Sequence, residues 1–406
     1  MKPLRVAVCA DFAEERWPSM DRIAASLVGS LRAHHAATID VASIVPRFTR
    51  RATRLSSGRA AFTADRILNR MWDYPRYVDG IGGAYDIYHV IDHSYGQLVH
   101  RLPAERTVVT CHDLDTFRSL LHPEGERRSP AFKAMMRRVL AGLQRAARVL
   151  SVTSAIRDEL IARSLVPADR VVVVPNGVGA PFVDRPDPDA DARAAGLVGS
   201  RPGAVELLHV GSTIPRKRID LLLAVCGALR REVPELHLVR VGGPFTAEQR
   251  GLAREAGLED RMSVLEFLDD RTLAAVYRRA SLVVQPSDRE GFGLPLIEAM
   301  ACGTPVAASD LPVLREVGGP AVEYCPPGMI ERWTECLLAL LRERREQPEL
   351  WMARRQAGLA RAARFSWPHS AARVAEVYAE VAASADHECR SKNAEGRSKV
   401  WKSAVL

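Results

Sequence analysis

Short runs rich in β-branched residues alternate with longer amphipathic runs along most of this chain, and this alternation occurs in two series. The first series extends from Leu4 to about Phe182, and the second from Val205 to Ala308. Alternation of strands and helices predicts a parallel sheet covered by helices on both faces, with ligands bound beyond the carboxyl ends of the strands. The sequence therefore predicts an α/β chain with two Rossmann-like, doubly wound domains.

The expected strands are short and bounded by turn-forming residues. They lie at residues 5–9, 85–91, 107–110, 148–152 and 171–174 in the first series, and at 205–210, 236–241, 263–267, 282–284 and 305–308 in the second. Residues 181–202 are rich in Pro, Asp, Ala and Gly and break the periodicity, so we expect a linker there. A chain of 406 residues with 47% hydrophobic content can bury two cores of ordinary size.

The formal net charge of +8 favours polyanionic ligands such as diphosphates, anionic lipid or nucleic acid. Nucleic acid fits least, because the basic residues are dispersed and no nucleic-acid-binding motif occurs. The seven cysteines form no Cys-x2-Cys pair, which argues against a metal site or a disulfide framework and favours a reducing cytoplasm. The first apolar stretch is too short for a signal peptide, and we find no transmembrane segment.

Two glutamates, Glu290 and Glu298, flank a glycine-rich turn within residues 287–306. Residues 281–285 are expected to form a buried strand that Pro286 ends, and helical spacing begins at Leu294. Glu298 would then lie about one turn inside the helix, on the side where free N–H groups attract anions. Taken alone, this spacing also fits two solvated surface charges.

The whole string from Ser287 to Val306 closely resembles the signature of the retaining family 4 glycosyltransferases. This resemblance implies a GT-B fold, in which two Rossmann-like domains face a central cleft and the C-terminal helix crosses back to the N-terminal domain. It also implies that Glu290 meets hydroxyls of the transferred sugar and that Glu298 holds the ribose of the nucleotide.

A second motif places Arg216 and Lys217 at the start of a helix, after a turn at Gly211 and Ser212. Cations oppose the dipole preference at a helix start, but a bound diphosphate would account for them. Similar transferases use such a pair to neutralise the leaving nucleoside diphosphate. Many of them have arginine directly after the glycine, where this chain has Ser212. The expected donor-binding residues are Gly211, Ser212, Arg216, Lys217, Leu268, Gly291, Phe292, Gly293, Leu294 and Glu298.

The N-terminal half carries His112 and Asp113 just beyond an expected strand end. A histidine there is often structural, but the family has one at this position that reaches the reacting sugar. We therefore expect His112, with Glu290, to be catalytic, and domain closure to bring it to the sugar. Relatives usually carry two glycines after the first strand; here Ser19 and Met20 follow Trp17. We expect Ser19 to act as a phosphate donor or helix cap on the acceptor side with Asp113, and Trp17 fits a core position equally well.

Two basic stretches are candidates for contact with an acceptor or an anionic membrane. Arginines 47, 50, 51, 54 and 59 fall in a poorly periodic segment. Lys133, Arg137 and Arg145 share a helical face opposite Phe132, Met136, Val139, Leu140 and Leu143. Such a helix could lie on a membrane, but packing against the core with solvated basic residues is the commoner arrangement.

Together these features indicate a retaining, metal-independent hexosyltransferase that uses a nucleoside diphosphate sugar and an alcohol acceptor in glycan, lipopolysaccharide or glycolipid synthesis, with no cofactor. Residues 1–182 would form an acceptor-side domain to which a helix at about 367–384 returns. Residues 203–366 would bind the nucleotide sugar, and residues 385–406 would form a disordered basic tail. The alternatives are a sugar-nucleotide epimerase of the same fold and a non-catalytic sugar-nucleotide-binding subunit.

Overall fold

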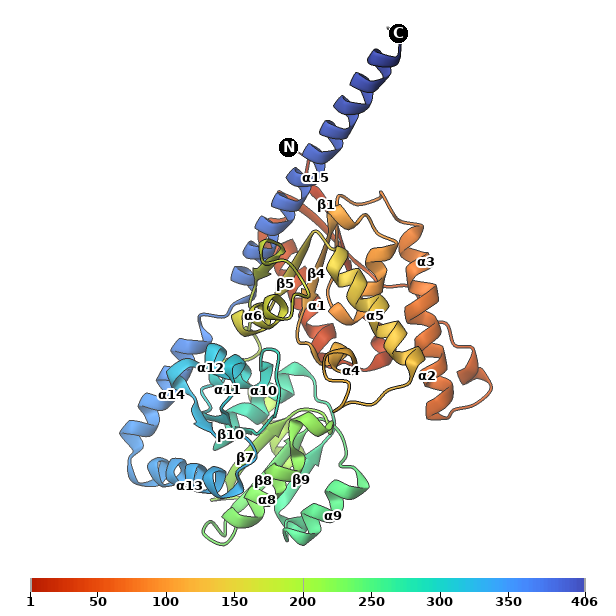
Figure 1. Ribbon diagram of the computed structural model, residues 1–406. Helices are drawn as coiled ribbons and strands as arrows, with labels where there is room; N and C mark the ends of the chain where they lie inside the picture. Colours follow the sequence, from red (N-terminus) through yellow and green to blue (C-terminus); the bar gives the residue numbers. More distant parts are fainter. Residues whose placement is uncertain (1, 200, 405–406) are drawn as a thin grey trace. The chain divides into compact units, whose positions relative to one another are not determined.

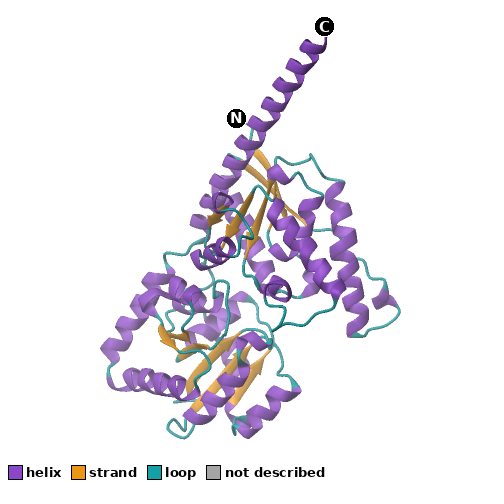
Figure 2. Ribbon diagram, viewed as in Figure 1, coloured by secondary structure: helices purple, strands orange, loops and turns teal. Residues whose placement is uncertain are grey.

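The computed structural model describes residues 2–199 and 201–404, and the chain divides into two compact units. Unit 1 contains residues 1–175 and returns with residues 367–406, and unit 2 contains residues 176–366. Each unit is built on one parallel sheet with helices around it (Figures 1 and 2).

The sheet of unit 1 has six parallel strands in the order β2-β1-β3-β4-β5-β6. Most positions of its central strands are fully buried, as expected for a sheet covered on both faces. The strands are β1 (Leu4–Cys9), β2 (Ile39–Ile44), β3 (Ile87–Val90), β4 (Thr107–Cys111), β5 (Arg148–Ser151) and β6 (Val171–Val173). The expected strands are confirmed, but β2 was missed. Its Asp40 and Ser43 interrupt the apolar run of this edge strand.

The helices of unit 1 occupy the connections between these strands. The longer ones are α1 (Pro18–His35), α2 (Arg59–Leu68), α3 (Tyr74–Asp79), α4 (Arg118–Leu121), α5 (Pro130–Arg145) and α6 (Ser154–Ala162). Shorter turns are η1 (Ala13–Glu15), η2 (Ala52–Arg54), η3 (Asn69–Asp73), η4 (His93–His100), η5 (Ala104–Arg106), η6 (Asp115–Phe117) and η7 (Ala168–Arg170).

Helix α5 packs its apolar face on η4 and so belongs to the core of unit 1. Met136, Val139 and Leu143 are buried, and a Cβ on Gly142 would lie only 1.9 Å from the carbonyl oxygen of Gly96. The absence of a side chain on both glycines lets the two backbones touch. Of the two arrangements considered for this helix, packing against the core is therefore the one that the structure shows.

The last helix, α15 (Trp367–Ala404), begins where the chain returns to unit 1 and packs along α1 and β3. Tyr378 on this helix is fully buried and hydrogen-bonds Nδ1 of His89 at 2.7 Å, while Nε2 of His89 meets the Thr110 hydroxyl at 2.7 Å. Burial, with a smaller contribution from His112, lowers the pKa of His89 to about 3. A neutral imidazole thus joins the returning helix to β3 and β4.

Unit 2 repeats the architecture with strand order β12-β11-β10-β7-β8-β9, all parallel. Its strands are β7 (Val205–Val210), β8 (Leu236–Val241), β9 (Met262–Leu265), β10 (Leu282–Gln285), β11 (Val306–Ser309) and β12 (Glu323–Cys325). All five expected strands are present. Strand β12 was not predicted, because three residues carry no periodic signal.

The helices of unit 2 include those expected from about residues 218, 246, 271 and 294. They are α7 (Pro188–Val198), α8 (Ile219–Leu229), α9 (Ala247–Glu255), α10 (Asp270–Arg279), α11 (Leu294–Ala301), α12 (Pro312–Gly318), α13 (Ile330–Glu346) and α14 (Pro348–Ala362), with η8 (Pro215–Lys217), η9 (Glu259–Arg261) and η10 (Gly319–Ala321). Trp333 and Leu337 of α13 and Leu222 of α8 lie in one apolar core with the β strands.

Two expectations about connecting segments require correction. The expected linker at residues 181–202 contains α7, which packs on α10 within unit 2. Asp187 caps this helix by accepting from the amide of Ala190, and Pro188 occupies its first position. The expected disordered tail from residue 385 is helical to Ala404, because it is rich in Ala, Glu, Lys and Arg and lacks proline. Its last two residues, 405 and 406, lie outside the described residues.

Tyr378→Phe should destabilise unit 1, because it leaves a buried imidazole nitrogen of His89 without its partner. Loss of a buried hydrogen bond costs about 1–3 kcal/mol, or roughly 2–12 °C in the unfolding midpoint of a unit of this size. Thermal unfolding followed by circular dichroism would measure the change. The matched control is Tyr77→Phe, at a side chain that is 41% exposed. Equal midpoints for the two variants would contradict the role given to Tyr378.

Candidate functional site

The first of two polar clusters lies in unit 2, where two neighbouring strands end. Strand β7 leads into the turn at Gly211 and then η8, and β10 leads into the loop before α11. Because β7 and β10 pair in parallel, both loops leave the same edge of the sheet. The backbone amide of Asp288 donates to the carbonyl of Arg216 at 2.9 Å and joins the two loops directly.

Glu290 lies at the centre of this cluster, and its side chain is only 6% exposed. Lys217 Nζ contacts Glu290 Oε1 at 2.5 Å, and Arg216 contacts Oε2 at 3.2 Å. The Ser287 hydroxyl and the Gln285 side-chain amide also donate to Oε1, at 2.7 and 3.0 Å. Burial by itself would raise the pKa of Glu290, but the two cations and the hydrogen bonds lower it to about 2.

The cluster carries two cations and one anion, hence a net charge of +1 at neutral pH. Lys217 is buried, and Arg216 also donates to the carbonyl of Arg289 at 2.9 Å. Fixed, partly desolvated charges attract an anion more strongly than solvated ones do. The arrangement is therefore suited to binding a phosphate or diphosphate group, although Glu290 already engages both cations.

Glycines shape the turn beside this cluster. Gly293 has a φ of 90° and caps α11, and a Cβ there would come within 2.7 Å of Leu314. A Cβ on Gly242 would lie 2.0 Å from the carbonyl oxygen of Gly211. Glycine at position 242, in the turn after β8, is thus required for the two loops to touch.

Arg240 was not predicted from the sequence, and its guanidinium binds the backbone of the same turns. It is fully buried on β8, donates to the carbonyl oxygens of Gly211 (2.6 Å) and Gly243, and lies over the Phe245 ring. Burial lowers its pKa to about 10, so it stays charged at neutral pH. The one sequence signal that could have identified Arg240 is its position inside an apolar strand, because a charged residue there needs buried partners.

The remaining expected donor residues have diverse environments. Gly291 and Phe292 are buried, with the Phe292 ring edge-on to Phe365, while Ser212, Leu268 and Leu294 are partly exposed. Glu298 is buried, and its Oε2 accepts from the Tyr277 hydroxyl on α10 at 2.9 Å. That contact does not place Glu298 with Arg216, Lys217 and Glu290, so its expected role at the ribose stays a prediction.

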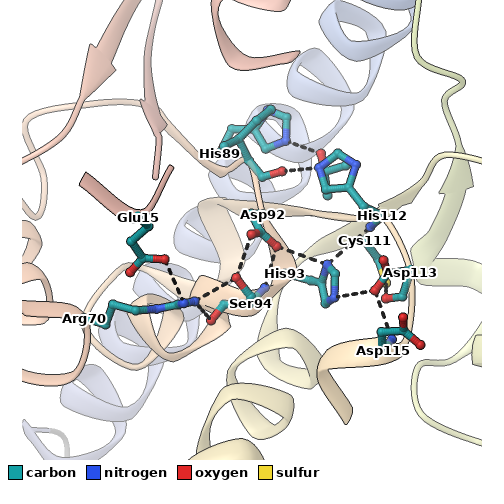
Figure 3. A network of polar contacts seen from close by, with 12 residues as sticks. Glu15, Arg70, His89, Asp92, His93, Ser94, Cys111, His112, Asp113 and Asp115 are labelled. Carbon is teal, nitrogen blue, oxygen red and sulfur yellow. Dashed lines mark hydrogen bonds and ion pairs between the residues drawn. The ribbon is translucent and has the colours of Figure 1, made fainter. Parts of the chain in front are cut away.

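The second polar cluster lies in unit 1, where β1, β3 and β4 end side by side (Figure 3). Asp11 follows β1, Asp92 and His93 follow β3, and His112 follows β4. The same placement rule that selected His112 would have selected Asp11, Asp92 and His93. They were not predicted, because only the segment after β4 resembles the family pattern.

His112 is buried, and its Nε2 lies 2.8 Å from the carbonyl oxygen of Ile91. A carbonyl only accepts, so Nε2 carries the proton and Nδ1 is the acceptor nitrogen. Burial lowers the pKa of His112, and the charge of Asp92 opposes that effect. The His112 ring is therefore neutral at pH 7 and can accept a hydroxyl proton through Nδ1.

His93 links the other members of this cluster. Its Nδ1 accepts from the backbone amide of His112 at 3.3 Å and lies 3.3 Å from Asp92 Oδ1, and its Nε2 faces Asp113 Oδ1 at 3.6 Å (Figure 3). Asp113 also accepts from the amide of Asp115 at 3.0 Å. The structure thus brings His112 and Asp113 together through His93.

Ser19 does not cap its helix. It is the second residue of α1, and the cap position is held by Trp17, which makes no side-chain capping bond. Pro18, at the first helical position, sets the start of the helix by its fixed φ. Trp17 is 43% exposed, so it does not take the core position that the sequence left open for it. The role of Ser19 toward a phosphate stays a prediction.

Arg70 is the cation of this cluster whose charge acts on Asp11. Its guanidinium contacts Glu15 Oε2 at 3.1 Å and the carbonyl and hydroxyl oxygens of Ser94 at 2.7 Å, and lies 4.0 Å from the Tyr95 ring centre (Figure 3). Neither carboxyl oxygen of Asp11 receives a hydrogen bond from the part of the chain that the structure describes. Burial, and then the charge of Asp92, raise the pKa of Asp11 well above its usual range.

Asp92 shows the opposite shift. Burial would raise its pKa, but His93, His112 and two hydrogen bonds from Ser94 lower it to about 2. Asp11 therefore holds its proton to a higher pH than Asp92 does, and the two carboxyl groups titrate as a coupled pair.

Comparison with known proteins matches both halves of the chain. Residues 23–180 match the model described as Glycosyltransferase Family 4, and residues 198–356 match Glycosyl transferases group 1. A D-inositol 3-phosphate glycosyltransferase of Thermobispora bispora is 34% identical over 321 residues, 74% of this chain and 71% of the relative. The chain belongs to the family 4 glycosyltransferases.

Other similar proteins agree with this family and its fold. The O-antigen chain mannosyltransferase B of Escherichia coli is 30% identical over 69% of this chain and 71% of its own. Sucrose-phosphate synthase of Thermosynechococcus elongatus aligns over 94% of this chain and 100% of its own, with a TM-score of 0.70 and 21% identity. HepE of Anabaena, solved with UDP and glucose, aligns over 93% of this chain and 100% of its own, with a TM-score of 0.70 and 16% identity. The chain therefore has the GT-B fold.

Residues 2–199 and 201–404 contain no group of three or more His, Cys, Asp or Glu residues placed to hold a metal ion. None of the helices described in those ranges is both long and apolar enough to span a bilayer.

Asp11→Asn should stabilise this glycosyltransferase increasingly as the pH rises. The folded-state pKa of Asp11 is raised, so the wild-type free energy of unfolding falls with pH from the unfolded value of about 3.9 upward through the folded one. Asparagine does not titrate and escapes this loss. Thermal unfolding midpoints between pH 4 and pH 9 should diverge in favour of the variant.

Asp92→Asn is the comparison with the opposite sign. The lowered pKa of Asp92 gives a stability contribution that is present above about pH 3.9 and is lost as the pH falls toward about 2. This variant should therefore unfold at a lower temperature than wild type at pH 7, and the gap should close in acid. If the difference in unfolding midpoint between Asp11→Asn and wild type does not change with pH, the pKa of Asp11 is not raised in the folded state.

Proposed function

We propose that this glycosyltransferase moves a hexose from a nucleoside diphosphate sugar to an alcohol acceptor, with retention at the anomeric carbon and without a metal or cofactor. The observation that carries the proposal is the cluster of Arg216, Lys217 and Glu290, which keeps a net positive charge at a loop edge of the unit 2 sheet. Retention is proposed from the resemblance of residues 287–306 to the family signature.

In the proposed reaction, the bond between the anomeric carbon and the diphosphate oxygen breaks, and the acceptor oxygen bonds to that carbon. The acceptor's proton passes to the departing diphosphate. Negative charge grows on the diphosphate, and cations that are already in place stabilise it without reorganisation. The planar guanidinium of Arg216 can bind two oxygens, whereas Lys217 supplies a point charge.

Glu290 has two functions in this proposal. Before the donor arrives, its carboxylate holds both cations at contact distance, so they are positioned in advance. When the diphosphate takes over these cations, the carboxylate becomes available to accept from hydroxyls of the transferred sugar. Gln285 and Ser287 keep it oriented throughout, because both donate to the same oxygen.

The proposed acceptor is an alcohol of a cell-surface glycan, a lipopolysaccharide or a glycolipid, and the proposed location is the cytoplasm in peripheral contact with a membrane. Relatives named for D-inositol 3-phosphate and for the O-antigen chain support this class of acceptor. The formal charge of +8 supports attraction to an anionic surface.

A nucleoside diphosphate sugar should raise the thermal unfolding midpoint of the chain, since a ligand of the native state stabilises it by about 2.7 kcal/mol at a hundred times its dissociation constant. A panel of UDP- and GDP-sugars, with the free diphosphates and monophosphates, would identify the base. Monophosphates should shift the midpoint less, because they engage the cation pair less fully. No shift with any member of the panel at millimolar concentration would refute the donor site.

Glu290→Ala and Lys217→Ala should each lower turnover by at least about a hundredfold, the cost of losing one group that stabilises developing charge. The measurement is release of nucleoside diphosphate from labelled donor in the presence of D-inositol 3-phosphate or mannosyl glycan acceptors. The double variant Arg332→Ala, Glu335→Ala removes an exposed ion pair from α13 and serves as the matched control.

The same assay separates the proposed reaction from its competitors. Diphosphate release that requires acceptor supports transfer, reversible inversion of the sugar would indicate an epimerase, and binding without turnover would indicate a non-catalytic subunit. Near-normal rates in both single variants would remove Glu290 and Lys217 from the catalytic machinery.

A further inference from the structure

Residues 59–79 of unit 1 form one helical run that buries polar side chains and leaves several apolar side chains exposed. The run consists of α2, the π-helical segment η3 and α3, which follow one another without a break (Figure 1). Two of its polar side chains, Asp65 and Asn69, are fully buried. A surface helix normally buries its apolar face instead.

The buried polar face of this run holds the arginine-rich loop before α2. Asp65 accepts from the amides of Arg51, Ala52 and Thr53 at 2.7–3.0 Å and from the Thr53 hydroxyl at 2.6 Å. Asn69 accepts from the amide of Thr49 at 2.7 Å and donates to its carbonyl at 2.8 Å. Burial by itself would raise the pKa of Asp65, but the bonds from Thr53, Ala52 and Arg51 lower it.

Several apolar side chains of the run face solvent, whereas Tyr74 and Val78 near its end are buried. Ile67 is 40% exposed, Leu68 43% and Trp72 54%, and Leu55 in the adjoining loop is 91% exposed. Leu68 and Trp72 are four residues apart and so lie on one side of the helix. Single exposed apolar residues are normal, but several on one helical face mark an interaction surface.

Arginines surround these apolar side chains. Residues 45–80 contain eight arginines and three aspartates, a net charge of +5 in a chain of +8. Asp65 is buried, and Asp73 is engaged by both terminal nitrogens of Arg51 at 2.7 and 2.8 Å. Arg76 lies over the Trp72 ring at 3.9 Å from its centre, and the arginines at 47, 50, 54 and 59 are exposed.

We propose that the surface formed by Leu55, Ile67, Leu68, Trp72 and the arginines of residues 47–59 docks on an anionic lipid bilayer. Apolar and indole side chains of such a surface enter the boundary between headgroups and acyl chains, while the arginines meet lipid phosphates. The net positive charge of residues 45–80 favours an anionic lipid surface, because a positive cluster is attracted to acidic headgroups within about one Debye length. Helix α5 cannot serve instead, because its apolar face is buried on η4.

Docking through this surface would place the chain at a membrane, as proposed above, but it does not depend on glycosyl transfer. The buried bonds of Asp65 and Asn69 explain why the surface persists without a partner. They hold the arginine loop against the helix through side chains that would otherwise lack partners in the core. The docking surface is therefore preformed and need not fold upon contact.

The test is co-flotation of the full-length chain with vesicles, measured without donor or acceptor. Vesicles of phosphatidylglycerol and phosphatidylcholine in a 3:7 ratio are compared with pure phosphatidylcholine. We expect at least tenfold stronger partition into the anionic vesicles, and weaker partition as salt is raised. Leu68→Ser with Trp72→Ser, and Arg50→Gln with Arg54→Gln, should each reduce it at least tenfold.

The matched control is Leu350→Ser with Met352→Ser on α14, where the two side chains are 50% and 51% exposed. It should bind vesicles like wild type, and all variants should keep the wild-type unfolding midpoint because the exchanged side chains are exposed. A fluorescence readout checks the geometry directly: lipids with brominated acyl chains should quench wild-type emission more than that of Trp72→Phe.

Three outcomes would overturn the docking surface. One is equal partition of the wild type into neutral and anionic vesicles. Another is undiminished binding by the Leu68→Ser, Trp72→Ser variant. The third is concentration-dependent dimerisation of the wild type that this variant abolishes, which would assign the surface to a second copy of the chain. Donor-induced stabilisation is measured separately, so failure of the membrane test leaves the transferase proposal intact.

Discussion

Parallel pairing of strands is the constraint on which both functional clusters of this protein depend. In a parallel sheet every strand delivers its carboxyl end to the same edge, and the loops that follow neighbouring strands must meet there. In unit 2 this brings the turn after β7 to the loop after β10, so that Lys217 reaches Glu290 across 73 positions of sequence. In unit 1 it collects Asp11, Asp92 and His112 from three adjacent strands.

The two clusters solve the problem of buried charge differently. Glu290 remains ionised because two cations and two neutral donors surround its carboxylate, and the cost of desolvation is offset. Asp11 lies beside another carboxyl group, and burial together with that neighbouring charge raises its pKa. The first cluster therefore presents a positive charge to an anionic ligand. The second presents a neutral imidazole at His112 beside the ionised carboxylate of Asp92, which suits hydrogen bonds with hydroxyl groups.

The need to satisfy buried polar groups also explains features outside these clusters. Arg240 is tolerated inside β8 because the carbonyl oxygens of Gly211 and Gly243 accept from it. Asp65 and Asn69 are tolerated beneath α2 because they satisfy the backbone of residues 49–53. In the second case two polar side chains of the helical run are buried inside the unit, and Ile67, Leu68 and Trp72 of the same run are left in solvent. A local hydrogen-bonding requirement thereby produces an exposed apolar surface framed by arginines.

Much of the fold followed from the sequence, because strand–helix alternation and glycine turns are local signals. The expected strands and the donor-side helices lie where the pattern placed them, whereas β2 and β12 carry too weak or too short a pattern. The sequence motifs also predicted Glu290, Arg216 and Lys217 as site residues. The contact between these three side chains could not be predicted from the sequence. The same holds for the contact of Glu298 with Tyr277, the exposure of Trp17 and the continuation of the last helix to Ala404.

The amino-acid sequence by itself determined the two doubly wound units, the family and the chemical character of the loops, because these depend on residue type and short-range spacing. The tertiary structure decided which charged groups meet, which of two neighbouring carboxyl groups keeps its proton, and which face of a helix is left to solvent. Those outcomes depend on distances and burial between residues far apart in the chain, and periodicity along one strand or helix contains no information about them.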